Sequence, residues 1–399
     1  MITSTLPRTA DVVVVGSGVV GAACAAALAR AGLSVCVIDR AGPAAGSSSS
    51  GEGNLLVSDK LPGPELDLAL HSLALWRRFA DSSRHGFEFD AKGGLVVAGS
   101  PGSLVTLDVT AASQRAAGVT VTAVSQSRLS DYEPLLAPEL SGGAHYPQDA
   151  QLQPMLAVRA LLADAVSAGS AVLAGCELTG CGRNSAGALT AVTTTRGIVS
   201  TPRLVIAAGA FSAEAAERVG VEVAVSPRRG HILVTEALPP LVRHKVYEAG
   251  YVSDVESSDA GLLSSAVVEG TDSGPILLGS SRELVGFDRR FDVRAAIAIA
   301  QRAMALFPFL RDVRLIRGYL GFRPATPDRL PIIGESARHP GVWLNTGHEG
   351  AGVGLAAGSA DVVRALMMGE SAAVDATPFS PDRPGLQTAE KVSHATSGR

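Results

Sequence analysis

The clearest pattern along the chain is a run of β-branched residues near its start, followed at once by glycines. Residues 11–15 read Asp-Val-Val-Val-Val, which is typical of a buried parallel strand. A glycine-rich turn over 16–21, an alanine-rich helix over 22–31 and a second apolar strand over 34–38 come next. This order predicts a strand–helix–strand unit, the building block of an α/β fold.

The turn after the first strand has the spacing Gly-x-Gly-x-x-Gly, which is typical of dinucleotide-binding proteins. Gly16 would permit the tight turn, Gly18 would let the backbone approach a pyrophosphate, and Gly21 would let the helix pack closely on the strand. Val19 and Val20 belong to this turn, and the helix that follows it would point its free N–H groups and the positive end of its dipole at the phosphates.

An acidic residue ends the second strand. Asp39 lies 18 residues after Gly21, where a carboxylate can accept hydrogen bonds from the hydroxyl groups of an adenosine ribose. Strand, helix, second strand and acid in register favour a bound dinucleotide. The alternative is a doubly wound fold whose site is vacant.

The remaining pattern predicts further elements and a discontinuous division of the chain. Apolar periodicity predicts helices over 63–82, 153–168, 293–307 and 354–368, and strands over 87–98, 171–179, 189–195, 204–212, 247–255, 261–268 and 276–280. We expect a Rossmann-like cofactor domain made of 1–82, 145–225 and 320–372, a substrate domain made of 83–144 and 226–319, and a polar tail over 373–399.

Composition argues against several classes of protein. Of the 399 residues, 46 % are hydrophobic and 18 % are charged, which argues against a disordered chain. The net charge of −4 argues against nucleic acid or an anionic membrane surface as the main partner. Glycines interrupt the apolar stretch 12–33, so we expect no integral membrane segment. The four cysteines have no Cys-x-x-Cys pair and no spacing suited to zinc, so we expect no metal and a reduced, cytoplasmic protein.

Several motifs, in order along the chain, carry a resemblance to a known family. They are the fingerprint with Asp39, the serine-rich loop 46–50, the strand 204–212, and the segments 227–231, 321–328, 331–334 and 347–354. Together they make residues 10–370 similar to the glycine/D-amino-acid oxidase (DAO) family of FAD-dependent amine oxidoreductases. More narrowly, the runs 51–54 and 229–236 look like the β subunits of hydroxyproline, proline and opine dehydrogenase complexes, with the flavin subunit of hydrogen cyanide synthase as a neighbour.

The resemblance implies an α/β fold with a Rossmann-like FAD-binding domain of the glutathione-reductase type. It implies a discontinuous α+β substrate domain built on an antiparallel sheet, with the flavin ring at the interface. Beyond the fingerprint, the residues that it places at FAD are Arg40, Ser47, Ser48, Ser49, Gly53, Asn54, Leu55, Cys176, Glu177, Ala208, Gly209, Gly321, Arg323, His348, Glu349, Gly350, Gly352 and Val353.

The glycine run 350–354 opens the last predicted helix. Its free N–H groups and the positive helix end would stabilise the anionic reduced flavin. The alternative is a glycine turn that only lets the helix pack closely. Some sarcosine oxidases attach flavin through a cysteine shortly before their Thr-Pro-Asp segment. That position is Gly321 here and no cysteine follows Cys181, so we expect noncovalent FAD.

The substrate that the resemblance implies is a small carboxylated amine, and Arg323 is expected to anchor its carboxylate. A planar guanidinium can bind a carboxylate with two hydrogen bonds. The alternative is a structural arginine paired with Asp328 or Glu335. Tyr251 lies at about the place where the family offers a tyrosine hydroxyl to the same carboxylate; the alternative is an ordinary strand tyrosine.

Three further residues have two interpretations each. His348 is either a proton acceptor that titrates near neutrality beside the flavin, or a turn histidine that only packs. Glu52 could contact a substrate ammonium group, but a solvated loop acid is the favoured interpretation. His231 is either a site residue or only the first residue of a strand. No dedicated base is required if the amine arrives neutral, so none is assigned.

The sequence leaves three functions open. The first is an FAD-dependent dehydrogenase of a small secondary amine or D-amino acid, such as D-hydroxyproline, proline or an opine. In it, hydride passes from Cα to flavin N5 and the electrons pass to an α or γ partner subunit or another acceptor. The second is an oxidase that makes hydrogen peroxide, and the third is a flavin-carrying assembly subunit without turnover. A NAD-only dehydrogenase is disfavoured because one fingerprint accounts for one adenosine.

Overall fold

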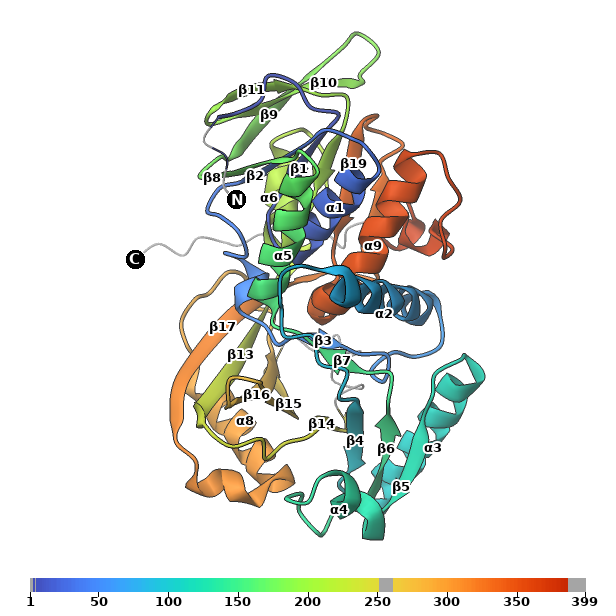
Figure 1. The fold of residues 1–399 in the computed structure, drawn as a ribbon, viewed down its shortest axis with the longest axis vertical. Helices are drawn as coiled ribbons and strands as arrows, with labels where there is room; N and C mark the ends of the chain where they lie inside the picture. Colours follow the sequence, from blue (N-terminus) through green and yellow to red (C-terminus); the bar gives the residue numbers. More distant parts are fainter. Residues whose placement is uncertain (1–2, 4, 251–260, 387–399) are drawn as a thin grey trace.

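The computed structural model describes residue 3 and residues 5–250 and 261–386. In Figure 1 these residues form an upper lobe around a six-stranded sheet and a lower lobe around an eight-stranded sheet. The chain crosses between the lobes several times, so each lobe is assembled from segments far apart in the sequence. The α/β fold class predicted from the sequence is confirmed.

The six-stranded sheet of the upper lobe has the order β18-β19-β12-β1-β2-β8. Its strands are β1 (Val12–Val15), β2 (Val35–Asp39), β8 (Ala171–Ala174), β12 (Leu204–Ile206), β18 (Ile332–Glu335) and β19 (Val342–Thr346). All neighbours are parallel except β18 and β19. The strand β1 is buried on both faces, and this is why all four of its positions are apolar instead of alternating with polar residues.

Alternate valines of β1 enter two different cores. Val12 and Val14 pack with the helices α1 (Val19–Arg30), α5 (Pro154–Ser167) and α9 (Gly352–Met367). Val13 and Val15 pack with the three-stranded antiparallel sheet β9 (Leu178–Arg183), β10 (Leu189–Thr194) and β11 (Gly197–Ser200), and with α6 (Ser212–Glu217). The helix α2 (Pro64–Ser82) lies across α9, between the two lobes in Figure 1.

The eight-stranded sheet of the lower lobe has the order β17-β13-β16-β15-β14-β4-β6-β5. Its strands are β4 (Gly94–Ala98), β5 (Thr122–Ser125), β6 (Gly142–Tyr146), β13 (Ser226–Ala237), β14 (Lys245–Glu248), β15 (Leu263–Gly270), β16 (Pro275–Arg282) and β17 (Leu315–Ala325). Every neighbouring pair is antiparallel except β4 and β14. We expected an antiparallel sheet in the substrate lobe, and the observed sheet is antiparallel apart from this one parallel pair of strands.

The helices of the lower lobe pack on opposite faces of its sheet. The helix α8 (Val293–Leu306) packs on β13, β15 and β16, on the face away from the upper lobe, and α3 (Pro101–Ala116) packs on β4 and β6, on the face that carries Val96 and Tyr146. Leu233 and Leu278 turn toward α8. Since side chains alternate along a strand, their neighbours Ile232 and Gly279 turn the other way, toward the upper lobe. No helix among the described residues is long and apolar enough to cross a membrane.

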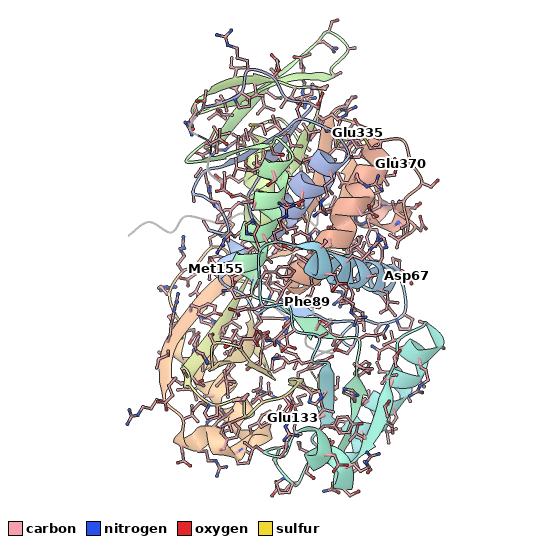
Figure 2. The ribbon with its side chains drawn as sticks, in the orientation of Figure 1. Asp67, Phe89, Glu133, Met155, Glu335 and Glu370 are labelled. Atoms are coloured by element: carbon pink, nitrogen blue, oxygen red, sulfur yellow. The ribbon has the colours of Figure 1, made fainter. Side chains whose placement is uncertain are left out.

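The remaining elements are short. They are α4 (Leu129–Tyr132) and the 3₁₀ turns η1 (Ser47–Ser49), η2 (Gln126–Arg128), η3 (Gly209–Phe211), η4 (Pro308–Asp312), η5 (Glu349–Ala351), η6 (Thr377–Phe379) and η7 (Pro384–Leu386). Glu133, labelled in the lower lobe in Figure 2, is fully buried just after α4. Its carboxylate accepts hydrogen bonds from the backbone N–H groups of Arg243 (2.9 Å) and His244 (2.5 Å), which holds the start of β14 in place.

Two expectations for the C-terminal part need correction. Residues 373–386 are not a loose polar tail, because Phe379 is fully buried and Arg383 binds Asp328 with Nε–Oδ2 at 2.6 Å. The buried ring of Phe379 and the paired guanidinium of Arg383 fix this segment against the rest of the protein, although its sequence shows no periodic pattern of apolar residues. In addition, β17 continues to Ala325, so the lower sheet extends past the boundary expected at residue 320.

A two-stranded sheet, β3 (Asn54–Leu55) with β7 (Ala150–Gln151), lies where the lobes meet. Beside it the fully buried carboxyl of Asp149 accepts hydrogen bonds from the backbone N–H groups of Val57 (2.8 Å) and Ser58 (3.3 Å), and it also bonds the Ser58 hydroxyl. Burial raises the pKa of Asp149 to about 7, although these hydrogen bonds oppose the shift.

We expect this carboxyl to make stability fall as the pH rises from about 4 to about 7. The folded protein keeps the Asp149 proton up to about pH 7, whereas the unfolded chain releases it near the ordinary aspartate pKa of 3.8. The linked free energy is about 4 kcal/mol. Asp149→Asn lacks this contribution. The unfolding free energy of the variant minus that of the wild type, both measured in urea, should therefore increase by up to this amount between pH 4 and pH 8. Parallel curves for the two proteins would contradict the assignment.

Candidate active site

A cleft opens between the lobes and brings together most of the residues predicted to contact a cofactor. The predicted residues that line it are Gly16, Gly18, Val19, Val20, Asp39, Arg40, Ser47, Ser48, Asn54, Cys176, Glu177, Ala208, Gly209, Gly321, Arg323, His348, Glu349, Gly350, Gly352 and Val353. Gly21, Ser49, Gly53 and Leu55 are not among the residues that line it. A Cβ on Gly21 would collide with the carbonyl oxygen of Gly16, and one on Gly53 with that of Leu152, so both glycines permit close backbone packing.

The phosphate end of the cleft is built around Gly16. Its φ of +104° is a left-handed value that favours glycine, and a Cβ there would collide with the carbonyl oxygen of Ala207. The Ser48 hydroxyl accepts a hydrogen bond of 2.9 Å from the backbone N–H of Val19, at the start of α1. One donor of the helix end is thus held by the serine-rich loop rather than left for a phosphate.

Asp39 already holds the backbone around the fingerprint. Its Oδ2 accepts from the N–H (2.8 Å) and hydroxyl (2.9 Å) of Ser17, and its Oδ1 accepts from the N–H groups of Ala41 (2.8 Å) and Gly42 (2.9 Å). A carboxylate offers about four acceptor sites. A ribose hydroxyl would therefore share oxygens that are fully engaged, so we expect Asp39 to organise the adenosine site as much as to contact it.

The sequence reasoning missed Phe211, Glu214 and Arg218, which line the adenosine end of the cleft. The ring centroid of Phe211 lies 4.1 Å from the guanidinium of Arg40, in a cation–π arrangement. Arg218 binds Glu177 at 2.9 Å and Glu214 at 3.0 Å. Phe211, Glu214 and Arg218 all follow strand β12, and their place after its glycine turn was the available signal.

The floor of the cleft is one face of β13 and β17. These strands run antiparallel, with Arg228 opposite Arg323 and Gly230 opposite Gly321. The two glycines leave a hollow between the lobes, and the Arg323 side chain occupies part of it. A Cβ on Gly230 would collide with that guanidinium, whose Nη1 also donates a hydrogen bond of 2.8 Å to the carbonyl oxygen of Ser281.

Positive charge is concentrated at the Arg323 end of the floor. Arg228 and Arg282 are almost fully buried there, and the Glu349 carboxylate lies 3.6 and 3.7 Å from their nearest nitrogens. Burial alone would raise the pKa of Glu349, but the guanidinium groups of Arg282, Arg323 and Arg228 outweigh it and lower the pKa. The alternative role for Arg323, a structural pairing with Asp328 or Glu335, does not occur among the described ion pairs: Asp328 binds Arg383 instead.

His348 needs a correction. It lines the cleft and is 3 % exposed, and burial lowers the pKa of its imidazole to about 3. It therefore does not titrate near neutrality and stays neutral throughout the working range. Its Nε2 has no hydrogen-bond partner among the described residues, so it remains available to a bound group.

The expectations for His231 and for the tyrosines have different outcomes from that for His348. His231 faces away from the cleft in the interior of β13, with Nδ1 3.0 Å from the Ser281 hydroxyl and Nε2 accepting from the N–H of Asp292 at 3.1 Å. This is a structural histidine. Tyr251 lies outside the described residues. Tyr247 is fully buried in the core of the lower lobe and donates to the Ser58 hydroxyl at 2.5 Å.

Glu52 is not the solvated loop acid favoured from the sequence. The residue is 9 % exposed and lines the cleft. Its Oε2 lies 3.3 Å from the Nζ of Lys245, a residue of the lower sheet nearly 200 positions away. Loop composition suggested a solvated acid because the sequence does not show that β14 would approach this loop.

The cleft fits an FAD molecule on three observations. It is lined by many glycines, which leave a flat ring and a pyrophosphate room to approach the backbone, it passes the N-terminus of α1, and it contains the unengaged Nε2 of His348. The residues at 16–20, 39–40, 176–177 and 208–218 would hold the ADP half. Gly321 and the residues at 348–353 would border the flavin ring, beside Arg323. When bound there, FAD supplies the hydride acceptor.

We expect the flavin to be noncovalent. A Cβ on Gly321 would lie 2.6 Å from the Cβ of Ser50, so the position that carries the flavin-linking cysteine in some sarcosine oxidases has no room for a side chain. Denaturation of the purified protein in trichloroacetic acid should leave all of the yellow colour in the supernatant. Flavin absorbance retained in the pellet would contradict this expectation.

Comparisons with known proteins agree with this cofactor. The family model described as FAD dependent oxidoreductase (DAO) matches residues 11–366. Glycine oxidase of Geobacillus kaustophilus is 29 % identical over 383 residues, which cover 93 % of this chain and 96 % of that protein. Hydrogen cyanide synthase subunit HcnC of Pseudomonas aeruginosa is 28 % identical, with coverage of 93 % and 95 %. An opine oxidase subunit of Rhizobium meliloti is 31 % identical over 188 residues, 47 % of this chain and 45 % of that protein.

Solved structures show the same fold. The crystal structure of glycine oxidase from Geobacillus kaustophilus superposes with a TM-score of 0.84 at 26 % identity, covering 94 % of this chain and 99 % of that one. L-proline dehydrogenase from P. horikoshii superposes with a TM-score of 0.85 at 21 % identity, covering 94 % and 98 %, a likeness of fold alone. The narrower resemblance to proline and opine dehydrogenase β subunits is thus only distant, and glycine oxidase matches nearly the whole chain.

Proposed function

The chain belongs to the DAO family of FAD-dependent oxidoreductases, and from this premise we propose that it is a dehydrogenase of a small carboxylated amine. As a family member it is an enzyme that uses FAD to oxidise amine or amino-acid donors. The proposed substrates are a secondary amine or D-amino acid such as D-hydroxyproline, proline or an opine. The electrons then pass to a partner subunit or another acceptor.

The observation that carries the proposal is the Arg323 guanidinium folded over Gly230. The glycines of β13 and β17 leave space above the floor, and the guanidinium borders that space. A carboxylate bound there by two hydrogen bonds is oriented as well as attracted. Orientation matters because hydride transfer requires the substrate Cα–H to lie about 3–3.5 Å from its acceptor.

The neighbouring residues support this chemistry. Arg228 and Arg282 add positive charge that favours a carboxylate, while Glu349 offsets part of it. Neutral His348 can donate or accept a hydrogen bond without adding charge. Residues of both lobes border the space, so a bound substrate would displace water from around the reacting atoms.

An oxidase that makes hydrogen peroxide is the second candidate, and one observation favours it: glycine oxidase matches 93 % of this chain. A third possibility, a flavin-carrying subunit without turnover, has support from two relatives that are named as subunits, those of hydrogen cyanide synthase and opine oxidase. Arg323 and the space beside it favour turnover over this third possibility.

A substrate panel tests the three functions. The FAD-loaded protein would be mixed anaerobically with D-hydroxyproline, proline, sarcosine, glycine and octopine, and bleaching of the flavin absorbance recorded. Bleaching followed by rapid dye reduction and slow oxygen uptake supports the dehydrogenase. Rapid oxygen uptake with peroxide release supports the oxidase, and no bleaching by any amine supports the assembly subunit.

A further inference from the structure

The Glu52 carboxylate has one oxygen that the protein engages and one that it does not. Oε2 accepts a hydrogen bond of 3.0 Å from the Asn54 amide and lies 3.3 Å from the ammonium of Lys245. Oε1 has no hydrogen-bond partner among the described residues, although the side chain is only 5 % exposed. A buried acceptor without a donor is costly, so this oxygen at the wall of the cleft indicates a ligand that brings a donor.

Charge identifies the kind of donor. Lys245 also bonds Glu269, and Lys92 lies close enough to Glu269 to interact with it electrostatically. Glu269 is therefore near two ammonium groups, whereas the described ion pairs give Glu52 a share of Lys245 alone. A ligand that places a cationic N–H group against Oε1 would compensate the charge of Glu52, whereas a neutral or anionic group would not.

Position identifies the ligand more closely. A Cβ on Gly279 would collide with Oε1 of Glu52 and lie 3.1 Å from Cδ1 of Ile232, so the carboxylate lies beside Ile232. The Arg323 guanidinium lies over Gly230, two residues earlier on β13 and on the same face. Two residues of a strand span about 7 Å.

This separation matches an α-amino or α-imino acid. Its amine and carboxylate are attached to the same carbon, and with a hydrogen bond of about 2.8 Å at each end it bridges roughly 8 Å. We propose that Glu52 binds the substrate amine at Oε1 while Arg323 binds the carboxylate, so that the zwitterion lies along β13 above Gly230. The assignment rests on the proposed function, and it adds an amine-binding carboxylate to the carboxylate anchor.

The same contact gives the substrate proton a destination. The bound ammonium loses one proton to Oε1, which turns the carboxylate into a carboxylic acid and leaves the amine neutral with a free lone pair. Hydride can leave Cα only from the neutral amine, because the lone pair forms the new C=N bond. The acid later releases the proton to water or product. Glu52 is thus both a binding group and a proton acceptor.

Two matched ligands test the assignment. Proline has an N–H group and a positive charge, and tetrahydrofuran-2-carboxylate has the same ring with an ether oxygen in place of the amine. Glu52→Gln keeps the size of the side chain but removes its charge. We expect about a 100-fold loss in the second-order rate constant of anaerobic flavin reduction by proline, or by the best amine of the panel. The affinity for tetrahydrofuran-2-carboxylate, read from the shift in flavin absorbance, should change less than threefold.

The pH profile gives a second readout. In Glu52→Gln the amine must arrive neutral from solution, so the rise of the rate constant should move toward higher pH. Glu52→Asp, which keeps the charge on a shorter side chain, should show an intermediate rate and a profile close to that of the wild type. Glu248→Gln is the matched control, since Glu248 is a more exposed glutamate of β14 paired with Arg302.

Three outcomes would overturn the assignment. Equal losses for both ligands would make Glu52 a structural residue, and a fall in bound FAD per protein would make it a flavin contact. Unchanged rates would show that the amine binds elsewhere. If no amine reduces the flavin of the wild-type protein, the proposed function itself fails. That failure is distinguishable from failure of the Glu52 assignment, because it is seen in the wild type before any variant is tested.

Discussion

Arg323→Met is expected to lower kcat/KM for the amine substrate by about 10²–10⁴-fold while FAD content stays the same. Two charge-assisted hydrogen bonds to a carboxylate contribute about 1.5–3 kcal/mol each, and both are lost together. Arg323→Lys should recover part of the loss, because an ammonium keeps the charge but cannot form the paired geometry. Steady-state kinetics with an artificial dye, with flavin absorbance per protein as the FAD measure, would check both values.

Arg317→Met is the matched control for this prediction. Arg317 lies on the same strand, β17, where its guanidinium is 5.3 Å from the ring centroid of Tyr319, and it does not line the cleft. Its removal should change kcat/KM by less than twofold. If Arg323→Met kept kcat/KM within threefold of the wild type, the carboxylate anchor would be disproved, because Arg323 is the guanidinium that lies over Gly230.

Lys245→Met is expected to cost about 3–5 kcal/mol of unfolding free energy at neutral pH. Methionine fills the space of the lysine stem but leaves the carboxylates of Glu52 and Glu269 without the ammonium that lies between them. Lys245 is 1 % exposed, so water cannot replace it. The measurement is urea unfolding of the FAD-loaded protein, compared with the wild type at pH 7.5.

Two further proteins make this result specific. Lys245→Met combined with Glu269→Gln should recover part of the stability, since one uncompensated charge is removed. Arg128→Met is the control: Arg128 and its partner Asp131 are 64 % and 59 % exposed and 3.1 Å apart, so about 1 kcal/mol or less is expected. A loss from Lys245→Met no larger than that from Arg128→Met would show that the cluster is not held by its charges.

The local part of the cofactor site was predictable from the sequence. The turn at Gly16, the start of α1 and the acid at Asp39 lie within 24 consecutive residues, and their spacing alone places them on one strand–helix–strand unit. The same holds for the glycine turn before α9. In each case short-range geometry decides where the side chains lie, so a pattern of residue types was enough.

The properties of single side chains were not predictable in this way. Whether Glu52 is solvated depends on Lys245, and whether His348 titrates depends on how completely both lobes enclose it. The pKa of a group is set by desolvation and by charges brought near it from anywhere in the chain. Residue types within a loop carry no record of those approaches.

The sequence by itself determined the family, the cofactor and the sites where the chain turns, because those depend on spacing along the chain. Only the tertiary structure decided which charges face the cleft. Strand pairing between β13 and β17 set Arg323 above Gly230, and the approach of β14 to the loop at Glu52 buried a carboxylate there. Both are contacts between segments about 90 to 190 residues apart, and burial in such contacts is a property of packing rather than of composition.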